Sequence, residues 1–404
     1  MTAGVVIVGG GVAGVSTAAA LRAGGYTAEV TLVDAGEFPY DRPPLSKDYL
    51  AGRATLTEIA LQRPEWYDEH KVRLINRRTV SALRPGTGQV ELSDGTTVTA
   101  DRVVLATGGH ALRPPIPGAD SDRVHVLRTA SDADALRARL RPGARVLVVG
   151  AGLIGAEVAS TAISLGCEVH VVDPIAPPLA AALGDDIATW LHAQHAAAGI
   201  RTEQTGVTAL RTDPGRIRVD FASNDDSHDF DLAVLGVGMV PDTTLAQAVR
   251  LDTDRGVLVD AARVTSNPSV LAVGDSARVR RDGRPLPRVE HWEAAQRDGQ
   301  IAAATILGTA PPASSAAWFW TDRHGLHVEA VATMSDAETV IVRGELGTPP
   351  FSAFGLVGDR VVAAVAVGDS VAVRAARRLI DREIAVDPSR LGDSSVDLKK
   401  LVRG

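Results

Sequence analysis

Two glycine-rich segments of the same spacing are the parts of this sequence best suited to chemistry. They are Gly9-Gly10-Gly11-Val12-Ala13-Gly14 and Gly150-Ala151-Gly152-Leu153-Ile154-Gly155. Each follows an apolar stretch and begins a helical pattern, so its glycines permit a tight turn and its backbone N–H groups face an anion. About 20 residues further on stands an acid, Asp34 or Asp173, that can accept ribose hydroxyls. The sequence therefore predicts two dinucleotide sites.

The residues around both segments predict strand, helix and strand in turn. The expected elements are strand 5–8, helix 12–21 and strand 29–33, and then strand 145–149, helix 153–165 and strand 168–172. One Rossmann-type unit is thus repeated inside the chain. Two proline-rich stretches, 113–118 and 309–316, are expected to be linkers.

The last part of the chain has a different pattern. Strands are expected at 327–333, 338–343, 352–356 and 360–367, with a turn at Gly358-Asp359 and a helix at 371–381. This predicts a small antiparallel sheet with helical cover. The predicted fold is α/β, with two dinucleotide-binding domains and a C-terminal α+β domain. The expected boundaries are 1–112 and 240–312 for the first domain, 113–239 for the second and 313–404 for the third.

Composition limits the possible functions. The chain has 404 residues, a formal net charge of −7 and one cysteine, Cys167. The acidic balance argues against nucleic acid as the main partner, and no apolar run approaches the roughly 20 residues that span a bilayer. One cysteine forms neither a CxxC redox pair nor a metal cluster, so electrons must pass directly to an external acceptor. We expect a cytoplasmic protein without a metal site, with Cys167 as a small core residue.

The residues after Asp173 indicate which nicotinamide dinucleotide is preferred. They are Pro174-Ile175-Ala176-Pro177-Pro178, and none carries a positive charge for a 2′-phosphate. An acid facing that phosphate would repel it, so we expect NADH. The alternative is that a basic residue from another segment contacts the 2′-phosphate, which would allow NADPH to bind.

Two further segments are compatible with a cofactor at the first site. Leu105-Ala106-Thr107-Gly108 follows an apolar strand, and a second strand ends at Gly274-Asp275. The Asp275 carboxylate could accept the hydroxyls of a polyol chain, or simply cap a helix.

With these segments in place, the chain resembles the FAD-dependent ferredoxin reductases of bacterial oxygenase systems, the putidaredoxin reductase type. These belong to the glutathione-reductase-like flavoproteins. The discriminating segments are Tyr40-Asp41-Arg42-Pro43-Pro44-Leu45-Ser46-Lys47 and Trp318-Phe319-Trp320-Thr321-Asp322, supported by Gly236-Val237-Gly238 and Glu290-His291-Trp292. The resemblance covers essentially the whole chain.

The resemblance implies FAD and NADH as cofactors, with specific contacts. For FAD the residues are Gly9, Gly11, Ala13, Gly14, Asp34, Arg42, Lys47, Val80, Thr107, Gly108, Arg128, Asp275 and Trp292. For NADH they are Gly150, Gly152, Leu153, Ile154, Gly155, Glu157, Asp173 and Gly238. It also implies that Lys47 lies near flavin N5 and pairs with Glu157, and that Trp320 lies against the flavin. Taken alone, Lys47 would be a surface lysine, Glu157 a favourable charge on a helix dipole and Trp320 core.

The implied reaction is hydride transfer from NADH to FAD, followed by single-electron transfers to a small iron–sulfur ferredoxin of the [2Fe–2S] or a similar type. The ferredoxin would serve a cytochrome P450 or another oxygenase. Reduction of rubredoxin, quinone or oxygen is an alternative, as is a redox-sensing flavoprotein similar to apoptosis-inducing factor.

This sequence also departs from the family pattern. The first ribose acid is Asp34 where glutamate is commoner, an arginine that usually follows the second strand of the NAD unit is missing, and Thr321-Asp322-Arg323-His324 replaces the usual Ser-Asp-Gln-Tyr. An acidic ferredoxin would need a local basic patch. We expect that patch at Arg374, Arg377 and Arg378, which share a helix face, together with Arg297 and Arg323. The alternative is an ordinary solvated helix face with local ion pairs.

Overall fold

The computed structural model describes residues 4–223 and 227–402, which form two compact units. Unit 1 comprises Met1–Arg42, Ala54–His110 and Met239–Ala313, and unit 2 comprises Pro43–Arg53, Ala111–Gly238 and Ser314–Gly404. The segment that carries Lys47 thus belongs to unit 2. The three-domain division expected from the sequence stays a prediction.

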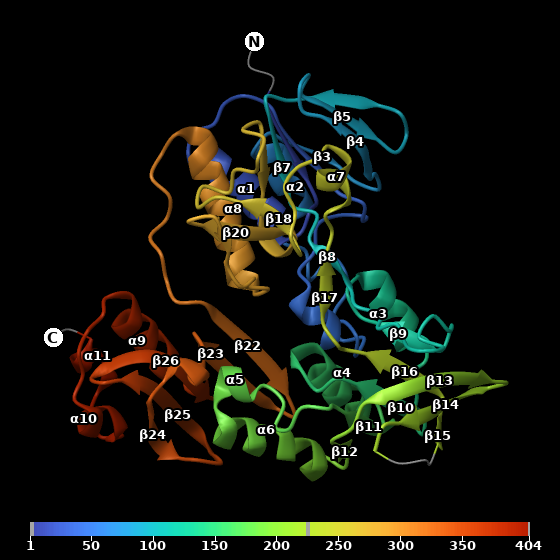
Figure 1. Cartoon of the computed structure of the whole chain (residues 1–404), viewed down its shortest axis with the longest axis vertical. Coiled ribbons are helices and arrows are strands. Elements are labelled where there is room, and N and C mark those ends of the chain that lie inside the picture. Colours follow the sequence, from blue (N-terminus) through green and yellow to red (C-terminus); the bar gives the residue numbers. More distant parts are fainter. Residues whose placement is uncertain (1–3, 224–226, 403–404) are drawn as a thin grey trace. The chain divides into compact units, whose positions relative to one another are not determined.

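A five-stranded parallel sheet is the centre of unit 1 (Figure 1). Its order is β19 (Val270–Ala272), β7 (Arg102–Leu105), β1 (Val5–Val8), β2 (Val30–Val33) and β3 (Val72–Ile75). All residues of β1 and β2 are buried, as is typical of parallel strands covered on both faces.

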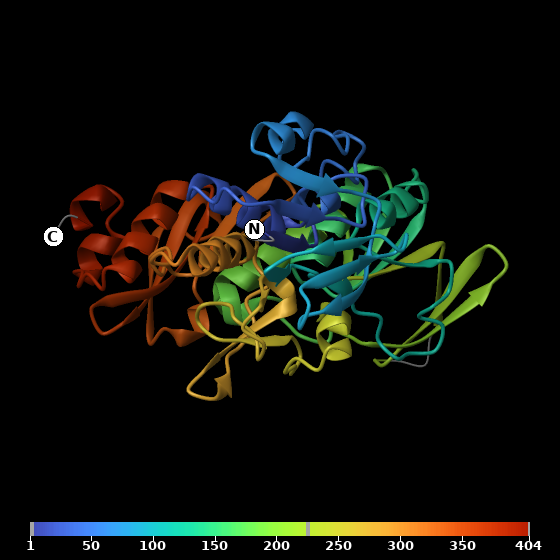
Figure 2. The ribbon, with the colours of Figure 1, turned by 90° about the horizontal axis from the view of Figure 1, so that it is seen from above.

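Two helices of unit 1, α1 (Val12–Ala23) and α8 (Trp292–Leu307), lie side by side (Figures 1 and 2). Small residues allow this approach: a Cβ atom on Gly299 would come within 2.4 Å of the Ala13 carbonyl oxygen. The other elements of unit 1 are α2 (Pro64–Glu69), β4 (Val80–Arg84), β5 (Gln89–Leu92), β6 (Thr97–Thr99), β8 (Gly109–Ala111), β17 (Met239–Pro241), α7 (Thr244–Ala248), β18 (Val257–Val259), the 3-10 turn Gly274–Ser276, β20 (Ala277–Arg281) and β21 (Arg284–Pro285).

A second five-stranded parallel sheet is the centre of the part of unit 2 formed by Ala111–Gly238. Its order is β12 (Arg201–Glu203), β11 (Glu168–Val172), β10 (Arg145–Val149), β16 (Leu232–Leu235) and β9 (Val124–Val126). Helix α4 (Leu153–Ser164) connects β10 to β11, as α1 connects β1 to β2. The predicted repeat of strand, helix and strand is therefore confirmed. Further elements are α3 (Ala130–Arg137), α5 (Ala180–Leu183), α6 (Asp185–Ala197), β13 (Val207–Asp213), β14 (Arg216–Phe221), β15 (Ser227–Phe230) and the 3-10 turn Pro43–Ser46.

The C-terminal part of unit 2 is an antiparallel sheet with helical cover, as predicted. The strand order is β22 (Trp318–Arg323), β23 (Leu326–Val331), β26 (Arg360–Val367), β25 (Thr348–Val357) and β24 (Thr339–Glu345). Helix α9 (Ser370–Asp381) packs on β26, and the 3-10 turn Met334–Asp336, α10 (Pro388–Gly392) and α11 (Leu398–Leu401) complete this part. The sequence patterns did not predict β22, whose side chains alternate between the two faces of the sheet.

Candidate functional site

The two glycine loops have the same geometry. Gly9 and Gly150 have φ angles of +111° and +96°, in the region that favours glycine. A Cβ atom on Gly9 would lie 2.2 Å from the Ala106 carbonyl oxygen, and one on Gly150 would lie 2.5 Å from the Gly236 carbonyl oxygen. Each loop therefore requires glycine at its first position, for the same steric reason.

The glycine directly before the helix in each loop, Gly11 or Gly152, faces open space. A Cβ atom on Gly11 or Gly152 would meet no atom within 4 Å, although each residue directly precedes a helix. An N-terminal helix end with open space in front of it can accept a pyrophosphate, so both loops fit a dinucleotide. Gly14 and Gly155, three residues further on, pack instead against the backbone of their own loops. A Cβ atom at Gly14 or Gly155 would lie 2.0 Å from the carbonyl oxygen of Gly9 or Gly150.

The two acids are held in equivalent places. Asp34 accepts hydrogen bonds from Gly10 N at 2.5 Å and Gly36 N at 2.6 Å. Asp173 accepts them from Ala151 N at 2.7 Å and Ile175 N at 2.8 Å. A carboxylate has about four acceptor positions, so each acid can still accept ribose hydroxyls.

The predicted FAD residues of unit 1 come together from distant segments. A Cβ atom on Gly274, next to Asp275, would approach the Cβ atom of Ala13 to 2.9 Å, so the second Gly-Asp strand ends beside the glycine loop. Trp292 donates from Nε1 to Asp41 Oδ1 at 2.7 Å.

The remaining predicted cofactor residues lie in varied surroundings. The Thr107 hydroxyl donates to the Asp242 carbonyl oxygen at 2.8 Å. Gly108 has a φ angle of +65°, and Val80 is half-buried on β4. Arg42 is half-buried, and Arg128 belongs to unit 2, where its backbone N–H donates to Asp132 before α3. Leu153 and Ile154 begin α4, and Gly238 has a φ angle of +114°.

Glu157 is the centre of a polar cluster within unit 2. Its side chain is only 6% exposed, and Lys47 Nζ lies 3.1 Å from its Oε1 atom. The Ser46 hydroxyl donates to Oε2 at 2.5 Å, while the Thr321 hydroxyl and the Asp322 backbone N–H donate to Oε1 at 2.8 and 3.2 Å. The predicted pair of Lys47 and Glu157 is thus present. Glu157 lies on α4, and Lys47 directly follows the 3-10 turn Pro43–Ser46. Its contact with a flavin stays a prediction.

Lys47 also faces the outer side of β22. Its Nζ atom lies 3.5 Å from Asp322 Oδ2 and 5.8 Å from the centre of the Trp320 ring. Trp320 is half-buried and stacks on Trp318, with ring centres 4.9 Å apart. The structure therefore groups the three residues predicted to be catalytic, Lys47, Glu157 and Trp320, within one unit.

The predicted basic patch is wrong in one respect. Arg323 is 4% exposed, because alternation along β22 turns its side chain inward with Phe319 and Thr321. Burial lowers the pKa of Arg323 to about 10, although the charge of Glu157 opposes this shift. Arg323 therefore cannot contact a docking protein.

The other arginines of that patch differ in exposure. Arg374 and Arg378 are exposed on α9. Arg377 is half-buried and donates to the Ser315 hydroxyl at 2.8 Å, and Arg297 is half-buried on α8. Of the three arginines on α9, only Arg374 and Arg378 are therefore exposed.

Neutral histidines surround Arg323. His324 Nε2 lies 2.9 Å from Nδ1 of the fully buried His195. Burial, and then the charge of Arg323, lower the pKa of His195 to about 3 and that of His324 to about 4. Burial also lowers the pKa of His192, which packs edge-on against His195. These rings are therefore uncharged at neutral pH.

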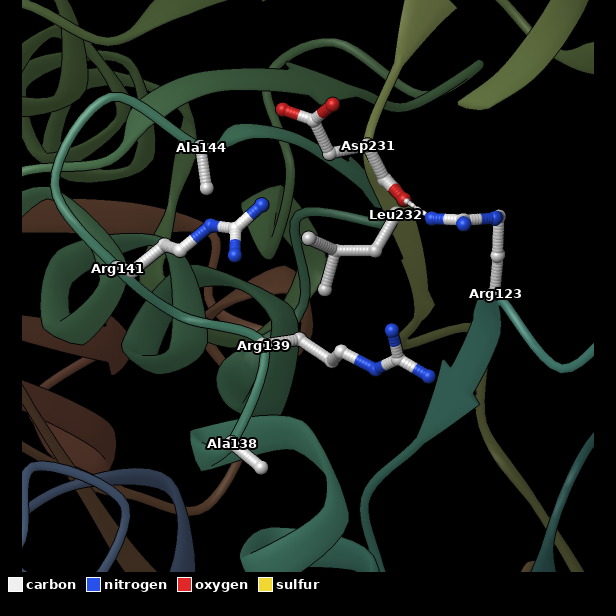
Figure 3. Close-up of a pocket in the computed structure, with 7 residues that line it drawn as sticks. All are labelled: Arg123, Ala138, Arg139, Arg141, Ala144, Asp231 and Leu232. Atoms are coloured by element: carbon white, nitrogen blue, oxygen red, sulfur yellow. Dashed lines mark hydrogen bonds between the residues drawn. The ribbon is translucent and has the colours of Figure 1, made fainter. Parts of the chain in front are cut away.

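A pocket of about 400 Å³ lies at the amino-terminal end of the parallel sheet of unit 2, where β9, β10 and β16 begin (Figure 3). It is lined by Arg123, Ala138, Arg139, Arg141, Ala144, Asp231 and Leu232. Arg123 donates to the Asp231 carbonyl oxygen at 3.1 Å. Because β10 begins at Arg145 here and ends at Val149 beside the glycine loop, this pocket is not the predicted NADH site.

Some residues of the site were not predicted. Ser46 and Thr321 contact Glu157 through hydroxyl groups that have no distinctive spacing in the sequence. Among the described residues, no group of three or more His, Cys, Asp or Glu side chains is arranged to hold a metal ion. Over the same residues, no helix is both long enough and apolar enough to cross a bilayer.

Comparison with known proteins defines the class. The model of the pyridine nucleotide-disulphide oxidoreductase family matches residues 3–299, and that of the reductase C-terminal family matches residues 318–402. The chain belongs to the pyridine nucleotide-disulphide oxidoreductase family, which confirms the predicted fold class.

Individual relatives narrow this class to the predicted type. The chain is 35% identical to putidaredoxin reductase of Pseudomonas putida, over 98% of this chain and 96% of the relative. It is 37% identical to the ferredoxin–NAD(+) reductase component of the anthranilate 1,2-dioxygenase system of Burkholderia cepacia, over 98% of both chains. The solved covalent complex of putidaredoxin reductase with putidaredoxin matches with a TM-score of 0.91 at 34% identity, over 99% of this chain and 98% of that one. The resemblance inferred from the motifs is confirmed.

Proposed function

We propose that this chain is an FAD-containing, NADH-dependent ferredoxin reductase that supplies electrons to a cytochrome P450 or another oxygenase. The observation that carries this proposal is the repeated glycine loop, with open space at Gly11 and again at Gly152. Two dinucleotides on a chain with one buried cysteine leave no protein disulfide as an electron relay. The electrons must leave for an external acceptor, and the relatives named above are ferredoxin reductases. We place the enzyme in the cytoplasm.

Each residue of the site has a separate task. The α1 loop with Asp34 holds FAD, and the α4 loop with Asp173 holds NADH. When bound, FAD accepts two electrons from NADH and releases them one at a time. Lys47 supplies positive charge beside the flavin, and Glu157 orients Lys47 and the nicotinamide.

The test begins with the purified protein. We expect about one FAD per chain, released into the supernatant by acid precipitation because the linkage is non-covalent. NADH should bleach the flavin, and putidaredoxin, used as a trial acceptor, should be reduced faster than oxygen or a quinone. If a quinone or oxygen is reduced faster than every ferredoxin tried, the enzyme is a small-molecule reductase.

Discrimination against NADPH should be at least tenfold in kcat/KM for flavin reduction. The Asp173 carboxylate accepts hydrogen bonds from the backbone N–H groups of Ala151 and Ile175, and it forms no ion pair with a described residue. A 2′-phosphate bound beside it would therefore meet a negative charge. A tenfold effect requires only about 1.4 kcal/mol. Stopped-flow reduction of the flavin with each nucleotide measures this discrimination. Asp173→Asn should lower the ratio of kcat/KM for NADH to kcat/KM for NADPH. Equal rates with NADPH in the unmodified enzyme would contradict the proposal.

Ferredoxin reduction should slow steeply as salt rises, because exposed charges are screened over about 8–10 Å at physiological ionic strength. Charge reversal at Arg374 and Arg378 should lower kcat/KM for the ferredoxin several-fold and leave flavin reduction by NADH unchanged. Arg390→Glu, on the exposed surface of α10, is the matched control. Wild-type ferredoxin kinetics in the α9 variants at low salt would place docking elsewhere.

A further inference from the structure

Asp298 is a largely buried acid on α8 that belongs to neither glycine loop. Its side chain is 17% exposed, and that of Arg263, with which it pairs, is 12% exposed. The Oδ1 atom of Asp298 accepts a hydrogen bond from Arg263 Nε at 2.8 Å and lies 2.7 Å from Nη2. A buried ion pair contributes little net stability compared with apolar side chains of similar size. The pair is therefore better explained by what else it holds in place.

The second carboxylate oxygen of Asp298 contacts the end of β19. Its Oδ2 atom accepts a hydrogen bond from the backbone N–H of Gly274 at 3.1 Å. Gly274 has a φ angle of +66° and directly precedes Asp275, so this bond lies at the turn that presents Asp275. Ala295, one helical turn before Asp298, packs on the same glycine, since a Cβ atom on Gly274 would lie 3.5 Å from the Ala295 Cβ atom.

Arg263 joins the same carboxylate to a further segment. Its φ angle is +67°, a conformation that a residue with a side chain seldom adopts. The Arg263 carbonyl oxygen accepts a hydrogen bond from the N–H of Ala272 in β19 at 3.0 Å, and its Nη1 atom donates to the Ala261 carbonyl oxygen at 2.9 Å. The Asp298 carboxylate thus connects three segments: α8, the end of β19 and the loop 260–264.

The turn at Gly274 also touches the glycine loop of α1. A Cβ atom on Gly274 would approach the Cβ atom of Ala13 to 2.9 Å. One on Gly299, the residue after Asp298, would come within 2.4 Å of the Ala13 carbonyl oxygen. Neither glycine leaves room for a side chain, so α1, α8 and the turn pack in direct contact. A shift of Gly274 would therefore move the Asp275 carboxylate relative to this loop.

The contacts of Asp298 require a carboxylate. Gly274 N–H and the Arg263 guanidinium are both hydrogen-bond donors, and a carboxylate offers an acceptor oxygen to each. A carboxamide has one acceptor oxygen and one donor nitrogen. Asparagine at this position would therefore leave either Gly274 or Arg263 facing another donor.

We infer that Asp298 is a positioning residue for FAD. Together with Arg263 it fixes Gly274, so that the Asp275 carboxylate stands beside the glycine loop of α1. The inference rests on the proposed function, in which Asp275 accepts hydroxyl groups of the FAD polyol chain.

Binding of FAD to the full-length protein from which FAD has been stripped tests this inference without a measurement of activity. Asp298→Asn should raise the Kd for FAD at least about tenfold, and Asp275→Ala should do the same. The double variant should bind FAD no more than about twofold more weakly than Asp275→Ala alone, because Asp298 acts through Asp275. Asp298→Glu keeps the charge but displaces the carboxylate from Gly274. It should weaken binding by a similar factor, and it decides the question if Asp298→Asn does not fold.

An ion pair elsewhere in unit 1 provides the control. Asp254→Asn deprives Arg278, which is 11% exposed and lies 2.7 Å from Asp254, of its carboxylate. Melting curves of the FAD-free proteins should show a comparable loss of Tm in Asp254→Asn and Asp298→Asn, whereas only Asp298→Asn should weaken FAD binding. Wild-type FAD affinity in Asp298→Asn, an equal loss in Asp254→Asn or additive effects in the double variant would overturn the inference. If Asp275→Ala binds FAD as tightly as wild type, the proposed FAD contact is wrong and the inference fails with it.

Discussion

Valine in place of Gly152 should reduce NADH affinity at least 100-fold and leave the protein folded. The residue has a φ angle of −66°, which valine can adopt, and its Cβ atom would enter space that is empty within 4 Å. In the proposed binding of NADH, the pyrophosphate approaches the backbone in that space. The branched side chain would occupy it, and a 100-fold loss corresponds to about 2.7 kcal/mol. Fluorescence titration with NADH and a melting curve measure the two effects.

The repeat in the fold provides a matched variant. Gly11 has a φ angle of −70° and the same open surroundings, so Gly11→Val should produce a folded protein that lacks FAD. Gly86, a glycine with no atom near its Cβ position in another loop of unit 1, should tolerate valine without loss of either cofactor. NADH affinity within threefold of wild type in Gly152→Val would refute the assignment of the α4 loop.

Methionine at Lys47 should slow reduction of bound FAD by NADH at least tenfold and lower the flavin midpoint potential by about 30 mV. In the proposed reaction the lysine supplies positive charge that favours the reduced, anionic flavin. About 1.4 kcal/mol of lost stabilisation corresponds to both numbers for a two-electron couple. Stopped-flow absorbance gives the rate, and a dye-coupled reductive titration gives the potential.

Lys399, exposed on α11 in the same unit, gives the control for this substitution. Lys399→Met removes an equal charge and should change neither quantity. If Lys47→Met retains the wild-type rate and potential, the ion pair of Lys47 with Glu157 serves only to hold the turn before Asp48 against α4.

The repeated units could be predicted from the sequence because their signals are local. An apolar strand, three glycines at fixed spacing and a terminal acid lie within about 30 residues of each other. The pairing of Lys47 with Glu157 joins segments far apart in the chain, and it was expected only because the motifs resemble a known family. No local pattern around Ser46 or Thr321 indicates that their hydroxyl groups complete the same cluster.

The error at Arg323 has a physical cause. Arginines are usually exposed, and Trp318-Phe319-Trp320-Thr321-Asp322-Arg323 has no alternation of apolar and polar residues that would predict a strand. Once residues 318–323 form a strand, alternation decides that Asp322 faces outward and Arg323 inward. The inward direction of the Arg323 side chain thus follows from β22, a strand that the sequence patterns do not predict.

The state of Cys167 determines how this protein resists chemical damage. The thiol is 3% exposed, and burial raises its pKa, so little of it is thiolate at neutral pH. Because the thiolate is the form that peroxides and alkylating agents attack, the chain has no readily oxidised sulfhydryl group. Hydrogen peroxide formed when electrons leak to oxygen should therefore not inactivate this enzyme by oxidising Cys167. A single cysteine introduced on its surface would also be the one position that a maleimide dye labels quickly.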